Sequence, residues 1–226
     1  MYENNNSFSP QQFSFLTPVV KNLLIINFIM FGIDFTAGQV FHFDLAKYLG
    51  LHYFTGENFY PWQYVTYMFM HADFSHIFFN MFALWMFGNV MERHWGSKRF
   101  LFYFLFCGIG AGFIQNIVNL YQISQIPSLY ASQFANAVNT VGASGAVFAL
   151  LLAFGMTFPN QYIYLYFLIP IKAKWFVIAY GVLELVSGIR GSAIDNVAHF
   201  AHLGGMLFGI ILILIWKRKD RKHYYY

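Results

Sequence analysis

Charged residues are scarce in this sequence: they make up 10% of its 226 residues, whereas 58% are hydrophobic. A soluble domain carries about 25% charged residues, so the composition excludes an ordinary soluble protein and indicates an integral membrane protein. The net charge of +4 does not indicate nucleic-acid binding, because the basic residues form short clusters between apolar runs. We therefore expect the lipid bilayer, and no nucleic acid, as a partner.

Cysteine and several common catalytic motifs are also missing. The single cysteine, Cys107, lies in an apolar run, which excludes an intramolecular disulfide and a cysteine metal cage. The chain has no H-E-x-x-H, no G-x-x-x-x-G-K-[ST] and, with alanine at position 146, no G-x-S-x-G. The usual zinc protease, an ATP-driven pump and the α/β-hydrolase elbow are thereby excluded. We predict no metal site, because no carboxylate lies at ligand spacing beside the candidate histidines, His71, His76, His199 and His202.

Long apolar runs predict an all-α fold, a polytopic bundle of six transmembrane helices. A helix needs about 20 apolar residues to cross the roughly 30 Å hydrocarbon core. The predicted spans are about 18–35, 75–93, 100–122, 144–158, 173–189 and 198–216. They form one membrane domain, 17–216, between a polar N-terminal tail, 1–16, and a basic C-terminal tail, 217–226. The first tail lacks the pattern of a cleavable signal peptide.

Two segments depart from a simple span. The fourth run must end before Pro159, and about 15 residues at 1.5 Å each reach only about 22 Å. One end of this helix should therefore lie inside the membrane, below a water-filled recess. The segment 36–73 is too polar to span but rich in aromatic residues, which collect at membrane–water boundaries. We predict a membrane-embedded first loop with short amphipathic helices, in preference to an ordinary extracellular loop.

Lysine and arginine predict the orientation of the bundle. With both termini cytoplasmic, 11 of the 13 basic residues face the cytoplasm, and only Lys47 and Arg190 lie outside, in agreement with the positive-inside rule. Ser144 then lies at the extracytoplasmic end of its helix. We expect a site that opens to the extracytoplasmic side of a bacterial inner or plasma membrane.

A serine and a histidine lie in two separate glycine-containing apolar runs. Ser144 stands between Gly142 and Gly145, and His202 is followed by Gly205 on the same helical face. Small residues let two membrane helices approach closely. If these faces meet, the hydroxyl comes within the roughly 2.6–3.2 Å that proton transfer to an imidazole requires. Packing of small residues without any chemistry is the alternative.

His76 and Asn80 form a second polar pair, in the second predicted span. They are four residues apart and therefore share one helical face. Both side chains can donate hydrogen bonds to a developing oxyanion. An interhelical hydrogen-bonded pair that only joins two spans would show the same spacing.

Three further polar residues bear on the choice of base. His199, three residues before His202, is a rival base, which we expect to be solvated or bonded to a loop. His71 precedes the second span and is expected to brace a loop. Glu184 lies in the fifth span at an unknown depth, and no carboxylate is evidently placed to orient His202. The sequence therefore predicts a Ser-His dyad and not a triad.

The combination of these motifs resembles the rhomboid family of intramembrane serine proteases. The likeness runs from about residue 62 to residue 209, in the order and topology of the family. It rests on His76-Ile77-Phe78-Phe79-Asn80, on Gly142-Ala143-Ser144-Gly145, on Ala201-His202-Leu203-Gly204-Gly205, and on Gly88, Glu92, Arg93 and Gly96 at the close of the second span. Family members often have tyrosine where this chain has Phe148, and Trp-Arg where it has Trp62-Gln63.

The resemblance implies a serine endopeptidase that needs no cofactor. Ser144 would be the nucleophile, and His202 the general base and then the general acid. His76, Asn80 and the backbone N–H of Ser144 would form the oxyanion hole. The substrates would be other membrane proteins, cut in or near their transmembrane segments. The alternatives are a catalytically inactive relative that binds transmembrane segments and a small transporter, although the internal repeat typical of transporters is missing.

Overall fold

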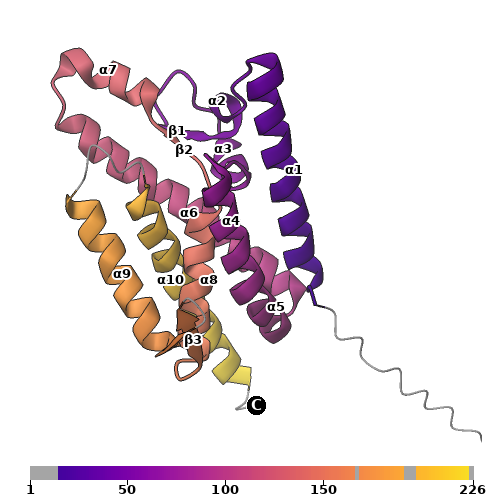
Figure 1. Cartoon of the computed structure of the whole chain (residues 1–226). Helices are drawn as coiled ribbons and strands as arrows, with labels where there is room; N and C mark the ends of the chain where they lie inside the picture. Colours follow the sequence, from indigo (N-terminus) through magenta and orange to yellow (C-terminus); the bar gives the residue numbers. More distant parts are fainter. Residues whose placement is uncertain (1–14, 166–167, 191–196, 224–226) are drawn as a thin grey trace, which may run out of the picture.

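Six long helical segments form a bundle in the computed structural model of this chain, which describes residues 15–165, 168–190 and 197–223 (Figure 1). The segments are α1 (Pro18–Phe41), α4 (Phe74–Ala83) continued by the π-helical turn η2 (Leu84–Gly88) and α5 (Asn89–Trp95), α6 (Ser97–Ser124), α8 (Ser144–Thr157), α9 (Ala173–Arg190) and α10 (His199–His223). Each predicted span coincides with one of them, which confirms the all-α membrane bundle.

Four of these segments are long and apolar enough to cross a membrane by length and composition: α1, α4 to α5, α6 and α10 up to Arg218. α8 is a shorter apolar helix of 14 residues, as its predicted end before Pro159 requires. The sequence placed the end of the first span too early. α1 continues to Phe41 because no proline follows Pro18 within it, and it ends at His42 in the left-handed conformation, with φ 51°.

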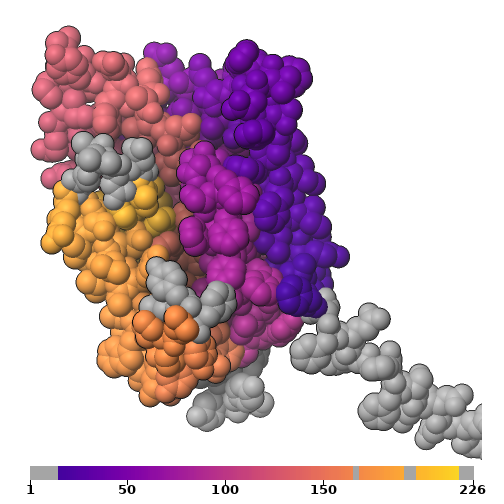
Figure 2. All heavy atoms as spheres, in the orientation of Figure 1, coloured from indigo at the N-terminus to yellow at the C-terminus, as the bar shows by residue number. Residues whose placement is uncertain are grey.

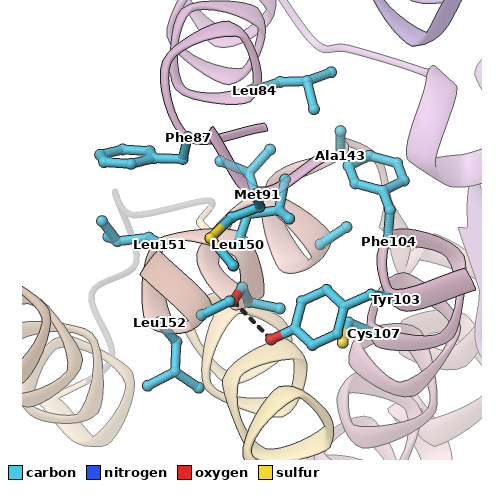
Figure 3. Packing of buried hydrophobic residues seen from close by; sticks show 14 of the residues in the cluster. Leu84, Phe87, Met91, Tyr103, Phe104, Cys107, Ala143, Leu150, Leu151 and Leu152 are labelled. Carbon is cyan, nitrogen blue, oxygen red and sulfur yellow. Dashed lines mark hydrogen bonds between the residues drawn. The ribbon is translucent and has the colours of Figure 1, made fainter. Parts of the chain in front are cut away.

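α8 occupies the centre of the bundle. Ten of its 14 residues are buried, and it contacts α4, α5, α6, α9 and α10. Its leucines pack among Leu84, Phe87, Met91 and Phe104, and the Tyr103 hydroxyl donates to the Ala149 carbonyl at 2.8 Å (Figure 3). On the face shown in Figure 2, α4 (magenta) lies between α1 (indigo) and the orange and yellow helices α9 and α10.

The first loop contains short helices, as predicted: α2 (Ala46–Leu49), α3 (Gln63–Thr66) and the 3-10 turn η1 (Tyr67–Phe69). The buried Gln63 side chain holds this loop together. Its Oε1 accepts from the backbone N–H groups of His52 and Tyr60, and its Nε2 donates to the carbonyls of Tyr48 and Asn58. A neutral amide, which can both accept and donate, thus satisfies four backbone groups of this loop.

Short elements outside the predicted spans complete the chain. α7 (Ser128–Ala137) is a helix between the third and fourth predicted spans. β1 (Leu51–His52) pairs antiparallel with β2 (Asn139–Thr140), which joins the first loop to the segment that leads into α8. β3 (Tyr162–Leu165) and β4 (Ile169–Lys172) form an antiparallel hairpin after α8. In Figure 1, α2 and α7 lie at the upper end of the bundle, whereas α8 and α10 begin lower, within it.

Candidate active site

Ser144 and His202 meet where α8 and α10 begin. Ser144 is the first residue of α8, and His202 lies in the first turn of α10. The Ser144 Oγ lies 2.8 Å from the His202 Nε2. The two helices can approach this closely because Gly205 has no Cβ. A Cβ at this position would overlap the carbonyl of Gly145. Gly145 and Gly205 therefore allow the Ser144 hydroxyl and the His202 imidazole to come within hydrogen-bond distance.

A carboxylate that the sequence analysis did not place completes this arrangement. Glu184 Oε2 lies 2.8 Å from Nδ1 of His202 and 2.7 Å from Nδ1 of His199. The expectation that no carboxylate orients His202 is therefore wrong. The physical reason is that α9 packs against α10 and buries Glu184 on that face, although the two residues are 18 positions apart.

The contacts of His202 determine its tautomer. A carboxylate oxygen only accepts hydrogen bonds, so Nδ1 of His202 must carry the proton that is donated to Glu184. Nε2 is then free of a proton and accepts the hydrogen bond of the Ser144 hydroxyl. Phe148 stacks on the imidazole, with ring centroids 4.2 Å apart and planes inclined by 7°. The ring is thus fixed by a hydrogen bond at each nitrogen and by an aromatic face.

His76 faces the turn that precedes Ser144. Its Nδ1 accepts from the Ala72 N–H at 3.4 Å, so a neutral ring carries its proton on Nε2. That Nε2 lies 2.6 Å from where a Cβ at Gly142 would stand, and the Ser144 Oγ lies 3.7 Å from the same point. Gly142 also has φ +122°, a conformation that side chains rarely adopt. Only glycine therefore leaves the space between the imidazole and the serine open.

Asn80 lies one turn after His76 and is buried. Its Nδ2 donates to the carbonyl of His76 at 2.9 Å, which uses one of the two N–H groups of the amide. The predicted pair is thus on one face of α4, and the amide is tied to its own helix. The second N–H of the amide is the group that an oxyanion would need.

Two residues before α4 support the position of His76. Asp73 caps the helix by accepting the His76 N–H at 2.8 Å, and hydrogen bonds from the Ser75 hydroxyl and the His76 N–H lower the pKa of its carboxyl. His71 is buried beside His76, with ring centroids 5.1 Å apart. Burial lowers the pKa of His71 to about 3, so this ring is neutral at physiological pH, and it braces the site through packing.

One group among the described residues could hold a metal ion: Glu184, His199 and His202, whose ligand atoms lie within 4.8 Å of one another. The sequence analysis missed this group because it did not place Glu184. Each Nδ1 in the group is already hydrogen-bonded to the carboxylate, and the remaining nitrogen of His202 faces Ser144. The donors are thus arranged as a hydrogen-bonded chain that ends at a hydroxyl, which is the geometry of an activated serine.

Comparisons with known proteins show similarity over most of the chain. Residues 58–219 match the family model described as Rhomboid domain. The chain is 31% identical over 188 residues to Rhomboid-like protein 11, chloroplastic, of Arabidopsis thaliana, covering 75% of this chain and 61% of that protein. It is 28% identical over 165 residues to the putative rhomboid protease YdcA of Bacillus subtilis, covering 72% and 71%. Rhomboid protease GlpG of Yersinia pestis is 22% identical over 226 residues, covering 96% and 71%.

The chain spans less than two thirds of some of these relatives, for example 61% of the chloroplast protein and 56% of rhomboid protease AarA of Providencia stuartii. The family model nevertheless covers most of the chain, from the first loop to the last helix. It includes the serine of α8, the histidine of α10 and the polar pair of α4. This chain therefore belongs to the rhomboid family.

Proposed function

We propose that this protein is an intramembrane serine endopeptidase. The observation that carries the proposal is the 2.8 Å contact between the Ser144 Oγ and the His202 Nε2 at one end of an apolar bundle. A serine hydroxyl is a weak nucleophile until an adjacent base accepts its proton. The deprotonated Nε2 of His202 is such a base, held in line by the ring contacts described above.

The reaction follows from the two sides of the site. The Ser144 Oγ attacks the scissile carbonyl carbon while its proton passes to Nε2 of His202. The carbonyl oxygen becomes an oxyanion, which Nε2–H of His76, the free N–H of Asn80 and the backbone N–H of Ser144 stabilise. The last donor stands at the N-terminus of α8, where the helix dipole adds positive potential. His202 then protonates the leaving amine, and water releases the acyl group from Ser144 by the reverse proton path.

The membrane location defines the class of substrate. The chain is an integral membrane protein, and its catalytic residues start helices that lie among apolar spans. We therefore propose transmembrane segments of other proteins as substrates, cut in or near the membrane where the helix unwinds. We further propose cytoplasmic termini and a site open to the extracytoplasmic side of a bacterial plasma membrane, because 11 of the 13 basic residues then face the cytoplasm.

A fluorophosphonate probe tests the proposal directly, since it labels only an activated serine. Purified wild-type protein in detergent should be labelled and should cleave a transmembrane test segment. Ser144→Ala and His202→Ala should lose both activities while remaining folded. Ser124→Ala is the matched control, because the exposed Ser124 hydroxyl bonds only to its chain neighbours, donating to the Tyr121 carbonyl and accepting from the Gln125 side chain. An unlabelled wild type, beside a reactive rhomboid protease run in parallel, would favour an inactive member of the family that binds transmembrane segments.

A further inference from the structure

Glu184 has an unusual set of partners for a carboxylate in an apolar bundle. One of its oxygens, Oε2, faces the Nδ1 of His202 at 2.8 Å and the Nδ1 of His199 at 2.7 Å. Within α9, all of which the structure describes, the buried residues are Ala173, Val177 and Glu184. Glu184 is thus the polar residue that this helix buries, and it is directed at the proposed base.

The chemistry of these contacts differs from that of a simple helix–helix bond. Because Nδ1 of His202 donates to the carboxylate, the proton cannot reside on Nε2 of the neutral ring, and Nε2 must accept from Ser144. When Nε2 takes the serine proton, the ring becomes an imidazolium beside a carboxylate that is already hydrogen-bonded to it. The attraction between an imidazolium and a carboxylate is stronger where little water surrounds them. The side chains of His202 and Glu184 are only 9% and 11% exposed.

We infer that Glu184 is a positioning residue for His202, so that the proposed dyad is extended to a Ser144–His202–Glu184 relay. The inference rests on the proposed function. The carboxylate selects the tautomer that can accept the serine proton, orients the ring and stabilises the imidazolium that forms during attack. No proton is transferred to Glu184 in this scheme. The proton moves from Oγ of Ser144 to Nε2 of His202 and from there to the leaving amine.

His199 has a supporting role in this arrangement. Its Nδ1–H donates to the same oxygen of Glu184, and its ring stands almost perpendicular to that of His202, with planes inclined by 85°. The second donor restrains the same carboxylate oxygen that accepts from His202. The sequence analysis treated His199 as a rival base, but its Nδ1 faces the carboxylate, whereas the His202 Nε2 faces the serine.

The test compares Glu184→Gln with wild type in turnover of a fluorogenic transmembrane peptide in detergent micelles. Glutamine keeps the size of the side chain but removes its charge and can present its amide N–H groups to the ring, which favours the wrong tautomer. We expect kcat to fall by at least about 10²-fold, toward the roughly 10⁴-fold loss seen when the carboxylate of a serine triad becomes an amide, with KM changed by less than about threefold. Glu184→Asp retains the charge and should recover part of the lost kcat.

Two controls separate this role from others. Glu57→Gln makes the same chemical change at an exposed position in the first loop and should match wild type. His199→Ala should lower kcat by less than about tenfold, since His202 keeps its own bond to the carboxylate. Thermal unfolding in detergent is followed for every variant. A merely structural Glu184, which only ties α9 to α10, would lower the unfolding temperature and reduce activity in proportion to the folded fraction.

The outcomes of this experiment are distinct from those of the probe experiment. If wild type is active and Glu184→Gln keeps kcat within about threefold, the relay is wrong while the proposed function stands. If the loss of kcat follows the folded fraction, or if Glu184→Asp is no better than Glu184→Gln, the relay is also wrong. If wild type is neither labelled nor active, the proposed function itself fails.

Discussion

Two glutamates, Glu92 and Glu184, are buried in this bundle and have contrasting partners. Glu92, in α5, accepts from the Thr17 hydroxyl and the Val20 N–H at one oxygen and from the Val19 N–H and the Ser97 hydroxyl at the other. Glu184, in α9, accepts from two imidazoles at a single oxygen. Both carboxylates are thus satisfied, but by donors of different kinds.

The kind of donor decides what each carboxylate can do. Hydroxyl and backbone N–H groups keep their protons at physiological pH, so the donors of Glu92 do not change. These hydrogen bonds join the start of α1 to α5 and α6. An imidazole can accept a proton at one nitrogen while it donates from the other, so the bonds of Glu184 respond to proton transfer at the next atom. The same residue type therefore joins helices at one site and, in the proposed relay, supports acid–base chemistry at the other.

The largest effect is expected at Gly205, which lets α10, the helix that carries His202, pack directly against the backbone of α8. A Cβ there would overlap the carbonyl and α-carbon of Gly145, and backbone atoms cannot yield as a flexible side chain can. Gly205→Val should push α10 away from α8, break the contact between Ser144 and His202, and abolish both cleavage and fluorophosphonate labelling. Gly181→Ala is the matched control, since its nearest neighbour would be the flexible end of Met206 at 3.4 Å. Normal turnover by Gly205→Val would mean that close helix approach does not set the site.

The second largest effect is expected at Glu92, which should determine stability, whereas Glu184 should determine turnover. Each oxygen of Glu92 accepts one backbone N–H, from Val19 or Val20. In Glu92→Gln, either orientation of the amide therefore leaves one buried N–H without an acceptor. We expect a loss of about 1.5–3 kcal/mol, or roughly 3–12 °C in Tm for a chain of this size. Scanning calorimetry in detergent gives the Tm, and kcat per folded molecule should stay near that of wild type.

If Glu92→Gln lowers kcat per folded molecule while Tm is unchanged, the contrast between the two carboxylates is wrong. The contrast is also wrong if Glu184→Gln lowers Tm and leaves kcat normal, because Glu184 would then act on stability as Glu92 does. The two variants are a matched pair, because the same chemical change is made at two buried positions. Both Tm and kcat per folded molecule are measured for each variant.

Much of the fold and of the candidate site could be predicted from the sequence, because the signals are local. Long apolar runs locate the helices, and Pro159 limits the length of α8. Ser144 and His202 are recognised because small residues surround them within one or two helical turns. Their pairing in the structure follows from the glycines that let α8 and α10 approach.

Glu184 could not be placed because its partner lies 18 residues away, beyond the end of its own helix. Most of α9 is exposed and apolar on several sides, so a periodic pattern does not show which side of the helix faces α10. The role of Gln63 was missed for a related reason. A single amide that bonds four backbone groups of an irregular loop leaves no repeating pattern in the sequence.

The smallest effect is expected at a third carboxylate, Asp73, which has neutral donors like Glu92 but is exposed to solvent. It caps α4 by accepting the N–H of His76. Asp73→Ala should cost about 1 kcal/mol of stability, measured as a shift in thermal unfolding. Asp73→Asn should preserve the cap, since asparagine is as good an N-cap as aspartate.

The contribution of Asp73 should also depend on pH. Hydrogen bonds from the Ser75 hydroxyl and the His76 N–H lower the pKa of this carboxyl below its ordinary value of 3.8. A lowered pKa in the folded state means that the stabilisation is fully present above 3.8 and is lost as the pH falls through the folded value. The difference in Tm between wild type and Asp73→Asn should therefore be constant at neutral pH and change only in strong acid. A difference that varied between pH 6 and pH 8 would contradict the assignment of this pH dependence to the Asp73 cap.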